Sequence, residues 1–164
     1  MNPKRQITIN ASASQLWNIL AKDYDKVGQW ATAVEKSIPN PDVPEGEGRV
    51  CTTTFGNNKE VITHLDEQER SFTYAVDFAK PPFFLEGIEN TWTIEPNGNN
   101  QSIVRMSADV QIKTIVGKLA APLIQRRMEK GFDGLLEELK YYAETGKIHP
   151  RKQEKLNAQK LQLV

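Results

Sequence analysis

The last third of the chain carries the strongest periodic pattern of apolar residues. Between residues 124 and 142 the apolar positions recur every three or four residues, which is the spacing of one face of an α-helix. Gly146, with Pro150 shortly after it, is typical of a helix end. Pro122 lacks a backbone N–H and clashes with the preceding helical turn, so we expect either a kink or the helix start there. The face consists of Ile124, Met128, Phe132, Leu135, Leu139 and Tyr142.

The region before residue 113 alternates between short runs of β-branched or aromatic residues and turn residues. Gly56-Asn57-Asn58 supplies the backbone angles that a hairpin needs, and Pro81 and Pro82 interrupt the pattern where a ladder could not continue. The regular spacing predicts about seven strands in an antiparallel meander. The predicted strands are 4–10, 34–38, 49–55, 60–65, 71–78, 85–95 and 103–112.

Two short helices are expected between the first two strands. Ser12 has Gln15 three residues later, as a capping box requires, and Leu16, Trp17 and nearby apolar residues follow at helical spacing. A second short helix is expected to end near Trp30. The fold class is therefore α+β, a curved antiparallel sheet of about seven strands around a long C-terminal helix.

Composition narrows the possible partners. The 164 residues fit one ordinary domain. Lys plus Arg and Asp plus Glu both number 21, so no overall charge attracts nucleic acid. Without a charged start followed by an apolar run, a cytoplasmic location is expected. No apolar stretch approaches the roughly 20 residues of a membrane span, so we expect no integral membrane association.

The end of the chain differs in charge from the rest. Residues 147–164 hold five Lys or Arg and one Glu, a net +4, which leaves residues 1–146 at −4. We expect one domain over 1–146 and a flexible, basic tail over 147–164.

The element order and several short motifs resemble the polyketide cyclase/dehydrase-type branch of the START-like (SRPBCC) superfamily, whose fold is the helix-grip. In that family the sheet and the last helix bound a cavity for hydrophobic molecules such as lipids, sterols or aromatic polyketides. The resemblance implies such a cavity here. The motifs are residues 9–17 ending in Trp17, Asp23 followed by Trp30, Gly48-Arg49, Phe55-Gly56, Glu60 before Leu65-Asp66-Glu67, and Tyr74.

Several residues are candidates to line that cavity. Tyr74 and Phe72 share one strand face, so the Tyr74 hydroxyl could enter a mostly apolar pocket. Asn90 lies among apolar neighbours and needs a hydrogen-bond partner. Trp30 either packs a short helix against the sheet or gates the pocket. The ligand-binding candidates are Trp30, Glu60, Phe72, Tyr74, Asn90, Trp92, Met106, Met128 and Phe132.

Catalytic chemistry has fewer candidates. Glu60, together with Tyr74 or Asn90, could move protons if burial desolvates its carboxyl group. The alternative is an ion pair between Glu60 and Arg49 across the hairpin. Cys51 is expected to be a buried structural thiol. His64 and His149 lie far apart and no phosphate-binding loop occurs, so no metal and no cofactor is expected.

Three functions remain open from the sequence. The first is binding or transport of a small hydrophobic ligand in an internal cavity, without catalysis. The second is a cyclase/dehydrase-like enzyme that uses Glu60 as acid or base. The third is a protein-interaction module of the co-chaperone type, with the basic tail or residues 81–85 as its contact surface.

Overall fold

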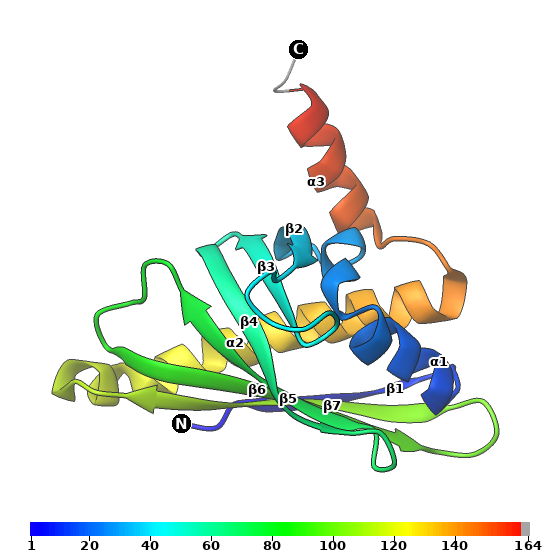
Figure 1. The fold of residues 1–164 in the computed structure, drawn as a ribbon, viewed down its shortest axis with the longest axis horizontal. Coiled ribbons are helices and arrows are strands. Elements are labelled where there is room, and N and C mark those ends of the chain that lie inside the picture. The colour runs from blue at the N-terminus through cyan, green and yellow to red at the C-terminus, as the bar shows by residue number, and fades with distance from the viewer. Residues whose placement is uncertain (162–164) are drawn as a thin grey trace.

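Seven antiparallel strands form one curved sheet in the computed structural model, which describes residues 1–161 (Figure 1). The strand order within these residues is β1-β7-β6-β5-β4-β3-β2. Strands β2 to β7 therefore lie side by side in sequence order, and β1 forms the opposite edge of the sheet beside β7. This confirms the predicted meander. The strands are β1 (Lys4–Ile9), β2 (Val34–Pro39), β3 (Gly48–Thr53), β4 (Gly56–Asp66), β5 (Ser71–Phe78), β6 (Leu85–Pro96) and β7 (Ser102–Ile112).

Short helical turns follow β1, namely α1 (Ala13–Trp17), the π turn η1 (Asn18–Lys22) and the 3₁₀ turn η2 (Tyr24–Gln29). The Ser12 hydroxyl accepts a hydrogen bond from the Gln15 backbone N–H at 3.2 Å, as the capping pattern predicts. The Gln15 side chain instead donates to the Ala143 carbonyl at 2.8 Å. Gln15 therefore ties α1 to the long helix instead of completing the reciprocal cap.

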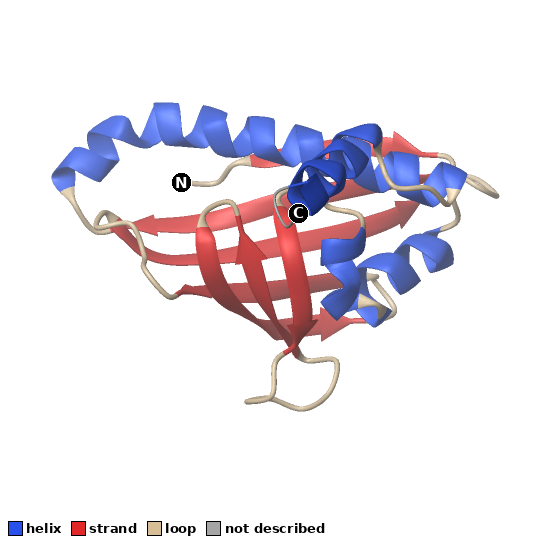
Figure 2. Ribbon diagram, turned by 90° about the horizontal axis from the view of Figure 1, so that it is seen from above, coloured by secondary structure: helices blue, strands red, loops and turns tan. Residues whose placement is uncertain are grey.

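The long helix α2 (Ile115–Thr145) lies along the sheet, with the short helical turns near its C-terminal part (Figure 2). Gly146 ends it in the left-handed region at φ 67°, and its N–H reaches the Tyr142 carbonyl. A helix start at Pro122 is wrong, because the Thr114 side chain already caps α2 seven residues earlier, at Ile115.

Most of the basic tail is helical and contacts the rest of the protein. It forms α3 (Pro150–Leu161), and Lys152 is almost fully buried, with its ammonium group donating to the Val34 carbonyl at 2.7 Å. Lys155 donates to the Thr32 carbonyl and pairs with Glu35. The long aliphatic part of a lysine side chain can pack against the protein while its ammonium group binds an acceptor. The residue type alone does not reveal which lysines are buried in this way. Residues 162–164 of the predicted tail lie outside the described residues.

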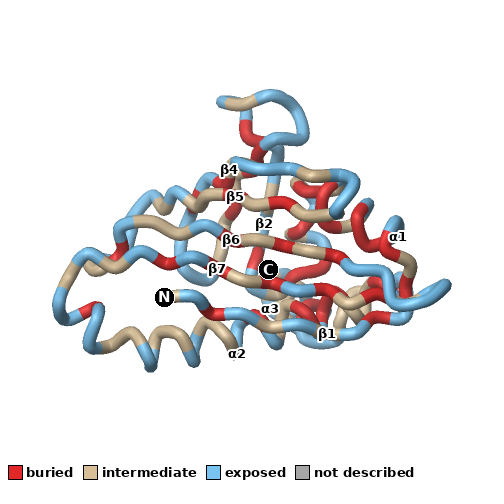
Figure 3. Tube along the Cα trace, turned by 90° about the horizontal axis from the view of Figure 1, so that it is seen from below, coloured by how far each residue is buried: buried red, intermediate tan, exposed pale blue. Residues whose placement is uncertain are grey.

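The buried core is unevenly distributed along α2. Buried residues gather in the half of the molecule that contains α1, while the N-terminal end of α2 is mostly exposed or half-buried (Figure 3). On α2 the large buried apolar side chains all belong to the second half, namely Phe132, Leu136 and Leu139. Along residues 1–161 no helix is long and apolar enough to cross a membrane.

Candidate functional site

An apolar pocket of about 150 Å³ lies inside the better-packed half of the molecule. The short helical turns, strands β2 to β6 and the inner face of α2 all contribute to its wall. Arg49 and Glu60 are its charged lining residues. The lining residues are Ile19, Leu20, Tyr24, Val27, Trp30, Ala33, Val34, Arg49, Glu60, Phe72, Tyr74, Trp92 and Leu135.

Five of the nine ligand-binding candidates line this pocket: Trp30, Glu60, Phe72, Tyr74 and Trp92. Phe72 and Tyr74 share one face of β5, where Phe72 faces Trp92 across the ladder. Trp30 stacks on Tyr142 of α2, so it joins a short helical turn to the long helix.

The other four candidates do not reach the pocket. Asn90, Met106 and Phe132 are buried in the surrounding core, and Met128 is half-buried against it. The pattern of apolar residues in the sequence predicts which side chains are buried. It does not predict which of them border the pocket, because that depends on how the side chains pack in three dimensions.

The charged end of the pocket is a buried ion pair. Arg49 and Glu60 face each other across the β3–β4 hairpin, and Arg49 Nε donates to Glu60 Oε2 at 2.7 Å while Nη2 lies 2.6 Å from the same oxygen. Each side chain is only 8% exposed. Burial opposes the charge of Arg49 and is the largest single effect, but the combined attraction of Glu60 and the neighbouring Tyr24, Tyr74 and Cys51 raises the pKa of Arg49. The predicted pair between these two residues is confirmed.

Tyr24 completes this end of the pocket. Its backbone carbonyl accepts from Arg49 Nη1 at 2.7 Å, its ring lies 4.0 Å from the guanidinium carbon, and its hydroxyl donates to Glu60 Oε2 at 3.4 Å. Burial raises the pKa of the Tyr24 and Tyr74 hydroxyls, so both stay protonated at neutral pH. Tyr24 is not predicted as a pocket residue, because the flanking Asp23 and Asp25 are typical of a break between short helices.

One oxygen of the buried carboxylate is uncommitted. Every side-chain hydrogen bond to Glu60 within residues 1–161 ends on Oε2 and none ends on Oε1. The pocket therefore offers a charge-compensated acceptor, beside two neutral hydroxyl groups, to whatever enters it.

Cys51, on β3, is fully buried, and burial raises the pKa of its thiol to about 12. We expect the native protein not to react with Ellman's reagent near pH 8, and to react fully once unfolded in urea. A fast reaction of the folded protein would contradict the buried position.

The same shift predicts a loss of stability in alkali. In the unfolded chain the thiol ionises near its ordinary pKa of 9.0, whereas in the folded chain it stays protonated until about 12. The folded state therefore binds more protons between these values, and the free energy of unfolding should fall as pH rises through this window. Urea unfolding followed by circular dichroism over this range measures the slope, and Cys51→Ala should make it shallower.

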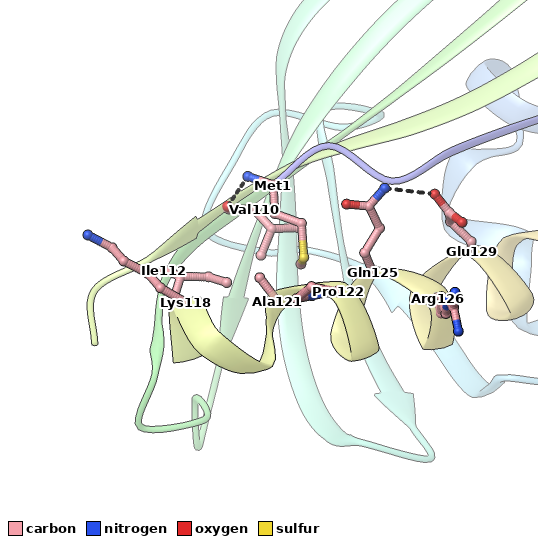
Figure 4. Close-up of a pocket in the computed structure, with 9 residues that line it drawn as sticks. All are labelled: Met1, Val110, Ile112, Lys118, Ala121, Pro122, Gln125, Arg126 and Glu129. Carbon is pink, nitrogen blue, oxygen red and sulfur yellow. Dashed lines mark hydrogen bonds between the residues drawn. The ribbon is translucent and has the colours of Figure 1, made fainter. Parts of the chain in front are cut away.

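A second, more polar hollow of about 700 Å³ lies between β7 and the N-terminal half of α2 (Figure 4). Met1 reaches into it from the strand side and Gln125 from α2. Lys118, Arg126 and Glu129 add charged groups to its lining, so the inner pocket fits an apolar molecule better. Along residues 1–161 no group of three or more His, Cys, Asp or Glu could hold a metal ion.

A family model described as "Polyketide cyclase / dehydrase and lipid transport" matches residues 4–144. The chain belongs to this family. The match covers every strand and all but the last residue of α2, and it confirms the resemblance to START-like proteins. No curated protein matches the chain in sequence.

Solved structures share the fold of this family member at low sequence identity. XoxI from Bacillus cereus is 17% identical with a TM-score of 0.69, covering 90% of this chain and 99% of XoxI. The di-domain ARO/CYC BexL of the BE-7585A biosynthetic pathway is 18% identical with a TM-score of 0.67, covering 86% of this chain and 45% of BexL. Norcoclaurine synthase from Thalictrum flavum, as a point mutant with a transition-state analogue, is 17% identical with a TM-score of 0.60, covering 85% and 93%. At these identities the likeness shows the helix-grip fold.

Proposed function

We propose that this family member binds a small hydrophobic ligand in the inner pocket and places one polar group of the ligand beside Glu60. The observation that carries the proposal is the enclosed aromatic pocket with a buried ion pair at one end. Burial of apolar ligand surface drives binding at about 25 cal/mol per Å². The family description, which includes lipid transport, supports a ligand of this class.

The pocket limits the size of the bound group. A cavity of about 150 Å³ holds one benzene-sized ring. We therefore expect the ring or a short aliphatic end of the ligand to occupy it. A ligand hydroxyl would donate to Glu60 Oε1, the acceptor that the protein leaves uncommitted.

The same oxygen supports a second proposal, in which the bound molecule is converted. Glu60 Oε1 is the group of the pocket best suited to accept a proton from a bound ring or carbonyl compound. Arg49 and Tyr24 would hold the carboxylate in place. Turnover of a phenolic or carbonyl substrate that Glu60→Gln abolishes, while binding persists, would favour this route over simple transport.

Binding can be tested with phenol and toluene, which differ in one hydroxyl group. We expect saturable binding of both by calorimetry, with phenol at least about fivefold tighter because its hydroxyl gains a charged acceptor. Ala33 is an exposed residue of the pocket wall, so Ala33→Trp should block entry and weaken both affinities at least about tenfold.

Ala158→Trp adds the same side chain to an exposed position of α3 and serves as the matched control. Equal affinity in Ala33→Trp and wild type, or no saturable binding by wild type, would overturn the proposal. If the proposal holds, native mass spectrometry of protein from its own host, compared with the denatured mass, identifies the retained ligand.

A further inference from the structure

The first turns of α2 present an apolar surface to solvent. Ile115, Val116, Leu119 and Leu123 are each between 64% and 79% exposed. Positions 115, 119 and 123 follow one another at four-residue intervals, so they share one face of the helix. The opposite face is packed, because Gly117 is buried against the protein.

A loop of the sheet extends this surface. Phe83, in the β5–β6 connection, is 70% exposed. Its neighbour Phe84 accepts a hydrogen bond from the Lys113 N–H at 3.0 Å, and its Cβ would lie 2.8 Å from a Cβ added to Gly117. The loop and the helix end therefore lie side by side. We call this surface the apolar tip, formed by Phe83, Ile115, Val116, Leu119 and Leu123.

Five exposed cations lie in segment 113–130, which also contains four of the five residues of the apolar tip. Residues 113–130 contain one acid, Glu129, which pairs with Arg5 at 2.9 Å. The segment thus carries five positive charges against one negative charge, a net +4 in a chain whose overall charge is zero. Within residues 1–161, none of the five cations forms an ion pair. This basic collar consists of Lys113, Lys118, Arg126, Arg127 and Lys130.

Two cations of the collar, Arg126 and Lys130, lie on the helix face that carries Leu119 and Leu123. Arg126 follows Leu119 by seven residues and Lys130 follows Leu123 by seven, which brings each cation back to the face of its apolar partner. The tip lies at the exposed N-terminal end of α2. The half of the molecule that contains α1 and most of the buried residues lies at the other end of this helix (Figures 1 and 3). A surface of this form can enter a planar boundary with its apolar part while the cations stay at the rim.

We propose that the apolar tip and basic collar dock the protein onto an anionic lipid bilayer. The aliphatic and Phe side chains would enter the boundary between headgroups and acyl chains, and the collar would bind the anionic headgroups. The composition favours lipid over a protein partner, since protein interfaces are depleted in Lys and their energetic centres are poor in Leu and Val. This inference does not rest on ligand binding in the inner pocket.

Vesicle co-sedimentation tests the proposal with the full chain. We expect binding to phosphatidylcholine vesicles that contain about one third phosphatidylserine, and loss of binding in about 1 M salt, where the Debye length is only about 3 Å. Vesicles of phosphatidylcholine alone should bind at least about tenfold less protein. Absence of wild-type binding to the anionic vesicles at low salt would overturn the proposal and leave this face to a protein partner.

Two variants separate the halves of the surface. Leu119→Ser/Leu123→Ser should weaken binding at least about tenfold through lost apolar burial, with Phe55→Ser as a control at another exposed apolar position. Arg126→Gln/Arg127→Gln should weaken it at least about tenfold, since each cation strengthens binding about fivefold. Lys36→Gln/Lys147→Gln removes equal charge elsewhere and should stay within about twofold of wild type.

Site-specific labelling provides a direct readout. Cys51 is buried, so a fluorophore on Leu123→Cys would report on the tip. Its emission should shift to the blue with anionic vesicles, while the same label on Phe55→Cys should not shift. Equal shifts at both positions, or binding that tolerates both double variants, would overturn docking through this surface.

Discussion

Replacement of Arg49 by methionine is expected to lower the free energy of unfolding by about 3–5 kcal/mol, because Glu60 then stays buried without a counter-charge. The guanidinium contacts Glu60 Oε2 through both Nε and Nη2, and both side chains are only 8% exposed. The substitution also removes the donor to the Tyr24 carbonyl and the cation over its ring. Urea unfolding followed by circular dichroism measures the loss.

The double variant Arg49→Met/Glu60→Met distinguishes the loss of the ion pair from the cost of leaving one buried charge without a partner. Since two apolar side chains leave no buried charge, it should regain most of the stability lost in the single variant. It should also lose the preference for phenol over toluene, because the acceptor oxygen is gone. Arg105→Met is the control, as it breaks an exposed pair with Glu95 and should cost no more than about 1 kcal/mol. A cost for Arg49→Met that equals that of Arg105→Met would contradict the prediction.

The sheet and the long helix could be predicted because their signals are local. The run 71–78 coincides with β5, and the last predicted strand, 103–112, misses only Ser102. Alternation along a strand and the four-residue repeat of a helix follow from backbone geometry alone. The helix start expected at Pro122 is wrong, because Thr114 caps α2 upstream and the helix continues through the proline.

The pocket could be predicted only in part, because it forms where five strands and helices converge. Trp92 and Asn90 lie on the same face of β6, yet Trp92 lines the pocket and Asn90 packs within the core. Periodicity assigns a face but not the place of a void on that face. Arg49 and Glu60 could be paired from the hairpin, whereas Tyr24 and Leu135 reach the pocket from elements distant in sequence.

The two halves of α2 also show that a helical pattern of apolar residues does not predict which of those residues are buried. The C-terminal half of the helix buries Phe132 and Leu139 against the sheet, so its apolar residues form the core. The N-terminal half leaves Ile115 and Leu119 exposed. The predicted apolar face covers only residues 124–142, and the position of each half of the helix relative to the sheet separates the core residues from the exposed ones.

Phe72→Ala is expected to cost about 3–5 kcal/mol and to enlarge the inner pocket. The ring is 1% exposed and meets Trp17 and Tyr24 edge-on, each at 5.9 Å between centroids, while it stacks on Tyr74 at 6.2 Å. Loss of the ring removes these contacts from the pocket wall, and close-packed neighbours relax only partly into the space. Thermal and urea unfolding measure the cost.

Ligand rescue distinguishes an enlarged pocket from general damage to the core. Benzene should stabilise Phe72→Ala more than wild type, because it can occupy the new apolar cavity. At a benzene concentration of about 100 times its Kd, the free energy of unfolding of the variant should rise by about 2.7 kcal/mol. Phe72→Leu, with an expected cost of about 1–2 kcal/mol, keeps the test open if the alanine variant does not fold. Phe55→Ala, at a 73% exposed position, should change neither stability nor the benzene response. Equal stabilisation of all four proteins by benzene would place its binding outside the Phe72 pocket, because only that pocket changes volume across the series.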